Sequence, residues 1–391
     1  MTHTVVQKII DSGPALAATA EESNRLGRLS DEAVRLIREA GTIRLLQPEE
    51  HGGMQAHPAD FAEAVMATAN YSPSAGWITG VVGVHPWEMA LMDPQLQEEV
   101  WGEDQDTWIA SPYAPGGLAI PTEDGSGYMV SGRWPFSSGT DHCEWAFLGA
   151  MVGTPEGKPA QPPAALHIVL PRSDYRIDQD SWDVMGLNGT GSKDVVVENA
   201  FVPKYRTIGS HVMGGATGIR PEPLYNLPFY SIFPIGITSA VIGASEGMLR
   251  IFLEQQKARH GWDGTGYLHE PHTTFAVGSA AADIAASRAL LIDTVTQMYD
   301  LVASGQEISM THRALARRNQ VSCAWRAARA ANEIFVRSGG NAIRRDNPLQ
   351  QYFRDINTGL QHAIHSPGGV FAASTTLEGG AELAPGTFLM A

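Results

Sequence analysis

Apolar side chains in the first 105 residues recur at the spacing of amphipathic helices. The segment from Ser30 to Gly41 begins with a serine and an acidic turn and ends on a glycine, which are signals that start and stop a helix. A second helix is predicted from Pro58 to about Asn70, where apolar side chains lie on one side. The pattern therefore predicts an N-terminal α-helical domain over residues 1–105.

Between residues 106 and 215 the pattern changes to short β-type runs separated by clusters of Gly, Pro, Asp and Ser. No pattern of helix length lies between these runs, so a sheet of alternating strands and helices is not expected. A central antiparallel β-barrel or sandwich is predicted instead. The runs are Tyr128–Val130, Trp145–Leu148, Leu166–Leu170 and Val195–Val197.

Residues 216–391 form the third region, where the pattern becomes helical again. No proline occurs between Pro271 and Pro348, and the stretch is rich in Ala, Leu, Arg and Gln. Such a composition predicts long helices packed as a four-helix bundle. The expected fold class is therefore α + β, with helices first, then the β-barrel or sandwich, then the bundle.

The chain has 391 residues and a formal net charge of -15, and this charge limits its partners. A negative surface repels nucleic acid and anionic membranes, so neither is expected as a partner. The N-terminus lacks the features of a signal peptide, and no apolar stretch reaches the ~20 residues that span a bilayer. We expect a cytoplasmic protein. The 13 histidines fall at no obvious metal-ligand spacing, so no metal site is expected.

The glycine-rich segment Gly186–Ser192 superficially resembles a dinucleotide-binding loop. Such a loop must follow a strand and open a helix, so that the helix N-terminus faces the pyrophosphate. Here the glycines lead into the β-type run at Val195. The sequence therefore argues against a Rossmann domain.

Three segments are similar to motifs of the acyl-CoA dehydrogenase superfamily. Phe201–Pro203 resembles the exit from its β-domain, and Val130–Gly139 resembles its flavin-facing strand. Phe353–Asp355 resembles its Arg-Asp signature near the C-terminus. The order helices, β block, helical bundle is also that of the superfamily, and the resemblance implies an acyl-CoA dehydrogenase-like fold.

The flavin-dependent monooxygenase branch of this superfamily is the closer resemblance, and it extends over nearly the whole chain. The chain resembles the oxygenase subunits that hydroxylate a phenolic secosteroid, and more distantly the 4-hydroxyphenylacetate 3-monooxygenase oxygenases. Where the dehydrogenases carry a catalytic glutamate, this chain has His362–Pro367. The segments that carry the resemblance are Leu45–Pro48, Gly83–Trp87, Glu98–Asp104, Ser111–Pro115, Phe136–Gly139 and Gly186–Ser192.

The resemblance implies a two-component aromatic monooxygenase. A separate NAD(P)H:flavin reductase would supply reduced FMN or FAD, and molecular oxygen would form a C4a-hydroperoxyflavin that hydroxylates a phenolic or polycyclic substrate. It also implies a homotetramer. Three alternatives stay open: an acyl-CoA dehydrogenase-like oxidoreductase, an oxygenase for an indole or aromatic polyketide, and a non-catalytic flavin-fold scaffold or sensor.

Two histidines are the main candidates for catalysis. By resemblance, His362 lies beside the flavin C4a position, where an imidazole exchanges protons near neutral pH; the alternative is a histidine that caps a helix end. His365 competes for the same role. His85 lies in an apolar segment between Trp77 and Trp87, where a histidine needs a hydrogen-bond partner. By the resemblance it is expected to orient a phenol oxygen; the alternative is a hydrogen-bonded core histidine.

Further residues are expected, by the resemblance, to contact the flavin. Ser137 and Ser138 follow Phe136 on the strand that faces the flavin N5 edge, and Ser138 is also a candidate for catalysis; the alternative for the serines is a polar turn before Gly139. The remaining contacts expected around the flavin ring are Trp77, Ser111 and Tyr113.

Two further contacts with the cofactor are expected by the resemblance, and Arg259 is expected to reach the flavin of an adjacent subunit. Arg259 resembles a phosphate-binding arginine, and Ser338-Gly339 lies where the backbone approaches the cofactor. Their alternatives are an exposed helix-terminal arginine and a plain helix C-cap. The segments 209–230 and 262–272 are expected to shape the substrate entrance.

Three arginines near residue 315 suggest a basic helix face that is solvated or lies between subunits. They are Arg313, Arg317 and Arg318.

Overall fold

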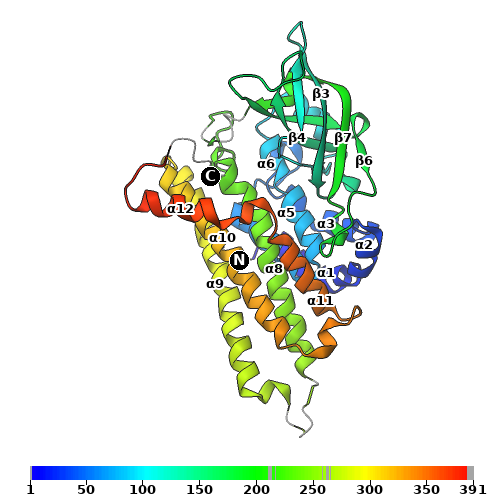
Figure 1. The fold of residues 1–391 in the computed structure, drawn as a ribbon, viewed down its shortest axis with the longest axis vertical. Coiled ribbons are helices and arrows are strands. Elements are labelled where there is room, and N and C mark those ends of the chain that lie inside the picture. The colour runs from blue at the N-terminus through cyan, green and yellow to red at the C-terminus, as the bar shows by residue number, and fades with distance from the viewer. Residues whose placement is uncertain are drawn as a thin grey trace.

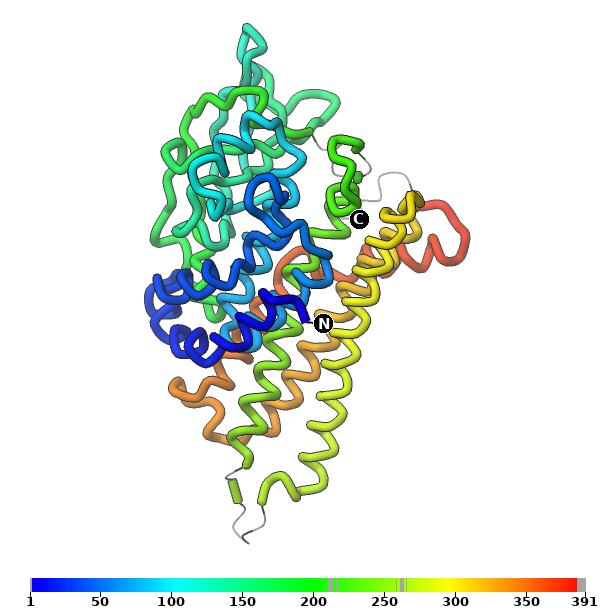
Figure 2. The backbone as a smooth tube through the Cα atoms, turned by 180° about the vertical axis from the view of Figure 1, so that it is seen from behind, coloured from blue at the N-terminus to red at the C-terminus, as the bar shows by residue number. Residues whose placement is uncertain are grey.

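The computed structural model describes residues 2–209, 214–215, 217–257, 259–260, 264 and 266–384. The β-sheet forms one end of an elongated molecule, and long helices extend from it to the other end (Figure 1). Seen from behind, the N-terminal helices lie beside the long helices, next to the sheet (Figure 2). The α-helices are α1 (Thr4–Ala18), α2 (Ala20–Leu26), α3 (Asp31–Ala40), α4 (Pro58–Tyr71), α5 (Pro73–Val82), α6 (His85–Met89), α7 (Pro94–Trp101), α8 (Phe229–Lys257), α9 (Pro271–Ala303), α10 (Met310–Val336), α11 (Pro348–Gly359) and α12 (Pro367–Glu378).

The two N-terminal helices predicted from the sequence are confirmed as α3 and α4. Ser30 precedes α3, and its side chain accepts a hydrogen bond from the backbone N–H of Ala33 at 3.2 Å. Gly41 follows the helix with φ 84°, a left-handed conformation that glycine adopts without steric cost. These local signals set the ends of α3.

The sheet has eight strands, and the four predicted runs lie in β3, β4, β5 and β7. Seven strands follow the order β6-β7-β3-β2-β4-β5-β8, and β1 pairs with β4. Most neighbours are antiparallel, but β1 and β2 each run parallel to β4, a pairing that the strand pattern did not specify. The strands are β1 (Ile109–Ala110), β2 (Gly117–Pro121), β3 (Gly127–Ser137), β4 (Trp145–Val152), β5 (Ala165–Pro171), β6 (Arg176–Asp178), β7 (Lys193–Pro203) and β8 (Thr207–Gly209).

Long helices fill the proline-free stretch, as predicted. Glu270 caps α9 by accepting from the N–H groups of His272 and Thr273, and Ser309 and His312 form a reciprocal capping box at the start of α10. Contrary to expectation, α8 and α9 each hold a stretch long and apolar enough to span a membrane. That stretch is 89% buried inside the protein in α8 but only 33% buried in α9. About two thirds of that stretch in α9 is therefore not buried in the single chain, although its larger apolar side chains, such as Ile284 and Leu291, are buried.

Two glycines bring α5 against α8. A side chain on Gly80 would collide with the backbone of Gly236, and the reverse also holds. Trp77 on α5 and Phe233 on α8 each lie three residues before one of these glycines, and the rings of both come near that of His362. The helical packing thereby positions two aromatic side chains of the candidate site.

The N-terminal and C-terminal helices share one hydrophobic core. Phe61 and Trp87 belong to the same buried cluster as Ile232, Leu291 and Ala327. The chain changes from helices to strands between α7 and β1, and returns to helices at α8. The division into domains 1–105, 106–215 and 216–391 stays a prediction.

Candidate functional site

The structure brings most of the predicted site residues together where the sheet meets α5, α8 and the turn before α12. Phe233 links two groups of them, because its ring lies 5.3 Å from that of Tyr113 and 6.4 Å from that of His362. The His362 ring is 5.9 Å from Trp77. The predicted residues therefore line two adjoining regions, one around Ser138 and His362 and one around His85.

Ser138 lies in a chain of hydrogen bonds that connects three segments. The indole Nε1 of Trp77 donates to Ser138 Oγ at 3.2 Å, and Ser138 Oγ is 2.7 Å from Ser192 Oγ. Ser192 Oγ is in turn 2.7 Å from Thr190 Oγ1, whose hydroxyl donates to the carbonyl of Leu187. The glycine-rich loop, which precedes β7 as predicted, thus supports the end of β3.

Ser137 and Phe136 end β3 in an unusual conformation. Ser137 is fully buried, and its hydroxyl has no hydrogen-bond partner among the described residues. Phe136 has φ 65°, rarely adopted by a bulky residue, and its side chain is 68% exposed. A buried hydroxyl without a partner costs stability, and strained backbone concentrates at functional sites. Both features fit a ligand at this strand end.

His362 lies just before the short helix η11 (Ala363–His365) and caps it. Its Nδ1 accepts a hydrogen bond from the backbone N–H of Ile364 at 3.2 Å. Burial, and then the charge of Arg317, lower the pKa of His362 to about 4. The ring is therefore neutral at pH 7, with its proton on Nε2 because Nδ1 is an acceptor. The alternative that His362 caps the end of a helix therefore holds. Its Nε2 is still available to a ligand, because no described residue forms a hydrogen bond to it.

His365 is fully buried and held by two partners. Its Nε2 lies 3.3 Å from Thr238 Oγ1 and its Nδ1 lies 3.2 Å from the carbonyl of Gly359. Burial, with the charges of His362 and Arg317, lowers its pKa to about 3. With both nitrogens occupied, His365 supports the turn and has no free atom for a ligand.

His85 is fully buried and hydrogen-bonded at both ring nitrogens. Nδ1 lies against the carbonyl of Ile109, and Nε2 is 2.7 Å from Ser111 Oγ. Burial lowers the pKa of His85 to about 4. Because a carbonyl only accepts, Nδ1 carries the proton, and Nε2 accepts from the Ser111 hydroxyl. The description of His85 as a satisfied core histidine therefore holds, and the Ser111 oxygen keeps acceptor capacity beside the Tyr113 hydroxyl, with which it also interacts.

Tyr113 lies in a group of rings beside a buried carboxylate. Its ring is 4.6 Å from that of His167 and 5.6 Å from that of His85. Burial and the neighbouring Glu88 raise the pKa of Tyr113 well above its usual value. Glu88 is fully buried; its Oε1 is 2.6 Å from His167 Nδ1, while its Oε2 has no hydrogen bond among the described residues.

Arg259 and Ser338-Gly339 meet one another but lie away from the other site residues. The Arg259 guanidinium lies 3.9 Å from the centre of the Tyr267 ring and donates to the carbonyl of Ser338 at 2.9 Å. Thr238, near His362, precedes the end of α8 by 19 residues, or about 30 Å of helix. Within one chain these residues therefore do not reach the site of His362.

The Arg-Asp segment fastens α11 to the glycine-rich loop. The buried Asp355 accepts from the backbone N–H of Leu187 at 2.6 Å, and Arg354 donates to the carbonyl of Met185 at 2.5 Å. Burial raises the pKa of Asp355 to about 6. These contacts support the loop that carries Ser192.

The expectation of a basic helix face was wrong for Arg317. This side chain is only 1% exposed and donates to the carbonyl of Ile364 at 2.6 Å. Its neighbour Arg318 is exposed and forms an ion pair with Glu378. Arg313 is half-buried and donates to the carbonyl of Gly214. Arg313 and Arg317, four residues apart, lie on the same side of α10, whereas Arg318 points about 100° away from Arg317, so the three arginines do not share one solvated face.

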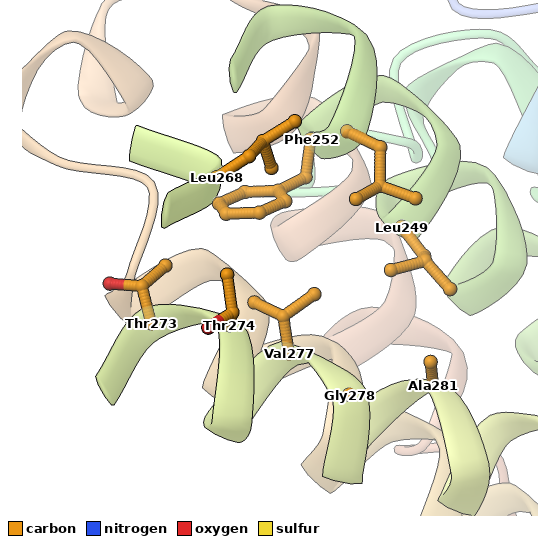
Figure 3. A pocket seen from close by; sticks show the side chains of 9 residues that line it. Leu249, Phe252, Leu268, Thr273, Thr274, Val277, Gly278 and Ala281 are labelled. Carbon is orange, nitrogen blue, oxygen red and sulfur yellow. The ribbon is translucent and has the colours of Figure 1, made fainter. Parts of the chain in front are cut away.

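An apolar hollow between α8 and α9 lies outside this site (Figure 3). Its volume is about 240 Å³, and it begins about 20 Å along α8 from Thr238. The expected entrance segments include residues 210–213, 216, 262–263 and 265, which lie outside the described residues. The hollow is lined by Leu249, Phe252, Leu253, Leu268, Thr273, Thr274, Val277, Gly278 and Ala281.

Sequence reasoning missed several polar residues of the site. Glu88 offered a signal, because it is the one acidic residue in the apolar segment 77–92. His167 offered none, since it is an isolated histidine in a strand. Thr190 and Ser192 lie in the segment Gly186–Ser192 that carried the resemblance, and Arg317 was assigned to a helix face, but none of the three was predicted as a site residue.

The residues around Ser138 fit a flavin ring. A planar aromatic group with a polar edge needs apolar walls and hydrogen-bond partners along that edge. Trp77 and the exposed Phe136 ring offer the walls, while the unpartnered Ser137 hydroxyl and the Nε2–H of His362 offer the polar contacts.

Known proteins are similar to this chain over its full length. The family described as "Acyl-CoA dehydrogenase, C-terminal domain" matches residues 235–367. A "Pigment production hydroxylase" of Rhodococcus erythropolis is 49% identical over 98% of both chains. The "Flavin-dependent monooxygenase, oxygenase subunit HsaA" of Rhodococcus jostii is 38% identical over 90% of this chain and 92% of that protein. The crystal structure of 3-HSA hydroxylase from Rhodococcus sp. RHA1 is 35% identical, covers 99% of this chain and 100% of that chain, and superposes with a TM-score of 0.92.

Proposed function

Because this chain belongs to the flavin-dependent monooxygenases built on the acyl-CoA dehydrogenase fold, we propose that its substrate is a phenol whose hydroxyl binds at Ser111. The chain is an aromatic monooxygenase that depends on flavin. The proposal concerns how the substrate is held and which residues carry the reaction.

The observation that carries the proposal is the pairing of Ser111 with His85. His85 has its proton on Nδ1, so its Nε2 accepts a hydrogen bond of 2.7 Å from the Ser111 hydroxyl. The serine oxygen then has only acceptor capacity left for a ligand. A phenolic O–H is a strong donor that matches it, and the nearby rings of Tyr113 and Phe147 suit a flat apolar ring.

The flavin is proposed to lie against Trp77, Phe136, Ser137 and Ser138. When bound in reduced form it would activate molecular oxygen, which is chemistry that protein side chains do not supply. A separate reductase would deliver it, as the name "oxygenase subunit" implies for the relative from R. jostii. Either FMN or FAD would serve, because the residues around the ring do not distinguish the two.

His362 is proposed to act as a hydrogen-bond donor at the reacting edge of the flavin. Its ring is neutral, and its free Nε2–H points away from the turn that occupies Nδ1. A neutral imidazole with this tautomer donates one hydrogen bond but does not remove a proton from the substrate. His362 is therefore given no role in removing the phenol proton.

We propose further that the protein works as a homotetramer. The low burial of the long helix α9 in the single chain supports this, as does Phe275, which is 81% exposed. Arg259 and Ser338, too far from His362 within one chain, would reach the flavin of an adjacent subunit. Static light scattering tests this: a mass of four chains is expected, and a monomer at working concentration would contradict it.

The substrate proposal is tested by a screen with chemically or enzymatically reduced flavin. Phenols, fused phenols, indole and unhydroxylated aromatics are incubated with the protein, and products are measured by mass spectrometry. The proposal expects one added oxygen atom on phenols, with little product from matched rings in which the hydroxyl is replaced by a methoxy group. Equal turnover of the phenol and its methyl ether would contradict it.

A further inference from the structure

Tyr113 lies between two hydrogen-bonded pairs of side chains. On one side, Oε1 of Glu88 is 2.6 Å from Nδ1 of His167, and the Tyr113 ring lies 4.6 Å from the His167 ring. On the other side, Ser111 Oγ is 2.7 Å from Nε2 of His85, and the Tyr113 ring lies 5.6 Å from the His85 ring. The Tyr113 hydroxyl interacts with the side chains of both Glu88 and Ser111. One tyrosine hydroxyl therefore has two oxygen acceptors beside it.

The other neighbours of Tyr113 are aromatic rings that hold it in place. Phe229 and Phe233 meet the tyrosine ring edge to face, with centroid distances of 5.2 and 5.3 Å. These phenylalanines offer no hydrogen-bond acceptor. Glu88 and Ser111 are therefore the side chains that compete for the Tyr113 hydroxyl proton.

Glu88 is the stronger of the two competitors. It is fully buried, and its Oε2 has no hydrogen bond among the described residues. A carboxylate oxygen is a better acceptor than a hydroxyl oxygen, and it is costly to bury without a partner. The Ser111 hydroxyl already has a partner in His85. The proton of Tyr113 is therefore directed toward Glu88.

The direction of this proton determines which groups face the substrate. With its proton turned to Glu88, Tyr113 presents only lone pairs to the space beside Ser111. The Ser111 oxygen also presents only lone pairs, because its own proton is bonded to His85. The two oxygens together match a ligand that donates a hydrogen bond. Without Glu88, the Tyr113 hydroxyl would be free to donate to Ser111 or to a ligand oxygen.

We propose that Glu88 is a positioning residue that sets the specificity of the substrate site, because it holds the Tyr113 proton away from Ser111 and leaves only acceptors for the substrate hydroxyl. The proposal rests on the proposed function, in which a phenol hydroxyl binds at Ser111. His167 contributes by binding Oε1 of Glu88, which leaves Oε2 for Tyr113. In this role Glu88 acts on the substrate only through the tyrosine.

The test measures how well the site distinguishes a phenol from its methyl ether, which has the same ring but no proton to donate. The ether is measured as an inhibitor of phenol hydroxylation, so its own turnover is not needed. The ratio of Ki for the ether to KM for the phenol is determined with reduced flavin. The proteins are the parent, Glu88→Leu, Tyr113→Phe and the variant with both changes. The matched control is Glu98→Leu, which replaces an exposed glutamate on α7.

The parent ratio should lie well above one, and Glu88→Leu should lower it by about tenfold, since the phenol loses an acceptor and the ether gains a donor. Glu98→Leu should keep the parent ratio. When Glu88→Leu is added to Tyr113→Phe, the ratio should change by less than twofold, because the hydroxyl that Glu88 positions is absent. A purely structural role of Glu88 would weaken both ligands alike and leave the ratio unchanged.

An unchanged ratio in Glu88→Leu would overturn the proposal, as would an equal fall with and without the Tyr113 hydroxyl. If the leucine variant does not fold, Glu88→Gln takes its place, because it is a neutral and weaker acceptor of similar size. It should give a smaller fall, and an unchanged ratio there would also overturn the proposal. A parent ratio near one would contradict the proposed function itself, and the role of Glu88 with it.

Discussion

Trp77 donates from its indole nitrogen to the hydroxyl of Ser138 at 3.2 Å, and this bond joins α5 to the end of β3. Because Ser138 also bonds to Ser192, a helix, a strand and the glycine-rich loop meet at one hydroxyl group. The contact holds Trp77, the proposed wall of the flavin site, in a fixed position. The position of Trp77 is therefore sensitive to the loss of the Ser138 hydroxyl oxygen.

Ser138→Ala should weaken reduced-flavin binding by about tenfold, the equivalent of one lost hydrogen bond. The variant leaves the Trp77 and Ser192 side chains without their shared partner. Binding is measured anaerobically by fluorescence or calorimetry. Ser173→Ala serves as the control, because Ser173 is an exposed serine that bonds only to its neighbour Asp174. Equal affinity in the Ser138 variant and the parent would count against the proposed flavin position.

Ser111→Ala should raise KM for a phenol by about tenfold while leaving the affinity for reduced flavin within twofold. His85→Leu should have a similar effect, because it removes the acceptor that orients the serine hydroxyl. Since the two residues act through one hydrogen bond, the double variant should lose less than the product of the single losses. Multiplicative losses in steady-state kinetics would show that the residues act independently.

His167→Leu should lower the free energy of unfolding by about 3 kcal/mol, because it leaves the buried Glu88 carboxylate without its partner. The measurement is urea unfolding at pH 7. Adding Glu88→Gln to this variant replaces the isolated carboxyl group by an amide, and it should restore part of the lost free energy of unfolding. A double variant less stable than His167→Leu would contradict the pairing.

Stability should fall as the pH drops below about 6.5, because His85, His362 and His365 are held neutral in the folded protein. An unfolded histidine binds a proton near pH 6.5, whereas these three resist it until the pH approaches 3 to 4. Between these values the unfolded state holds more protons, so the free energy of unfolding decreases with falling pH. His365→Gln should reduce that slope by about 1.4 kcal/mol per pH unit. An unchanged slope would show that His365 is protonated in the folded state.

Local signals in the sequence located α3, α4 and four strands of the described sheet. Ser30 and Gly41 bound α3, and the β-type runs lie within β3, β4, β5 and β7, because caps and alternation act over a few residues. Strand pairing depends on contacts between distant segments. The parallel pairing of β2 with β4 therefore could not be predicted from the pattern of apolar and polar residues.

The candidate site was predicted in part, through the resemblance rather than the pattern. The resemblance named Ser138, His85 and His362, which the structure places in adjoining regions. It did not give the tautomers of the histidines, since these depend on the Ile109 carbonyl and the Ile364 N–H. Nor could a run of arginines reveal that one side chain points inward.

The most direct test of the site is a crystal structure of the protein with bound flavin. We predict that the isoalloxazine ring lies against Trp77, with its polar edge within hydrogen-bonding distance of Ser137 or Ser138 and beside Nε2 of His362. A ring bound elsewhere, with these side chains unchanged and out of contact, would contradict the account.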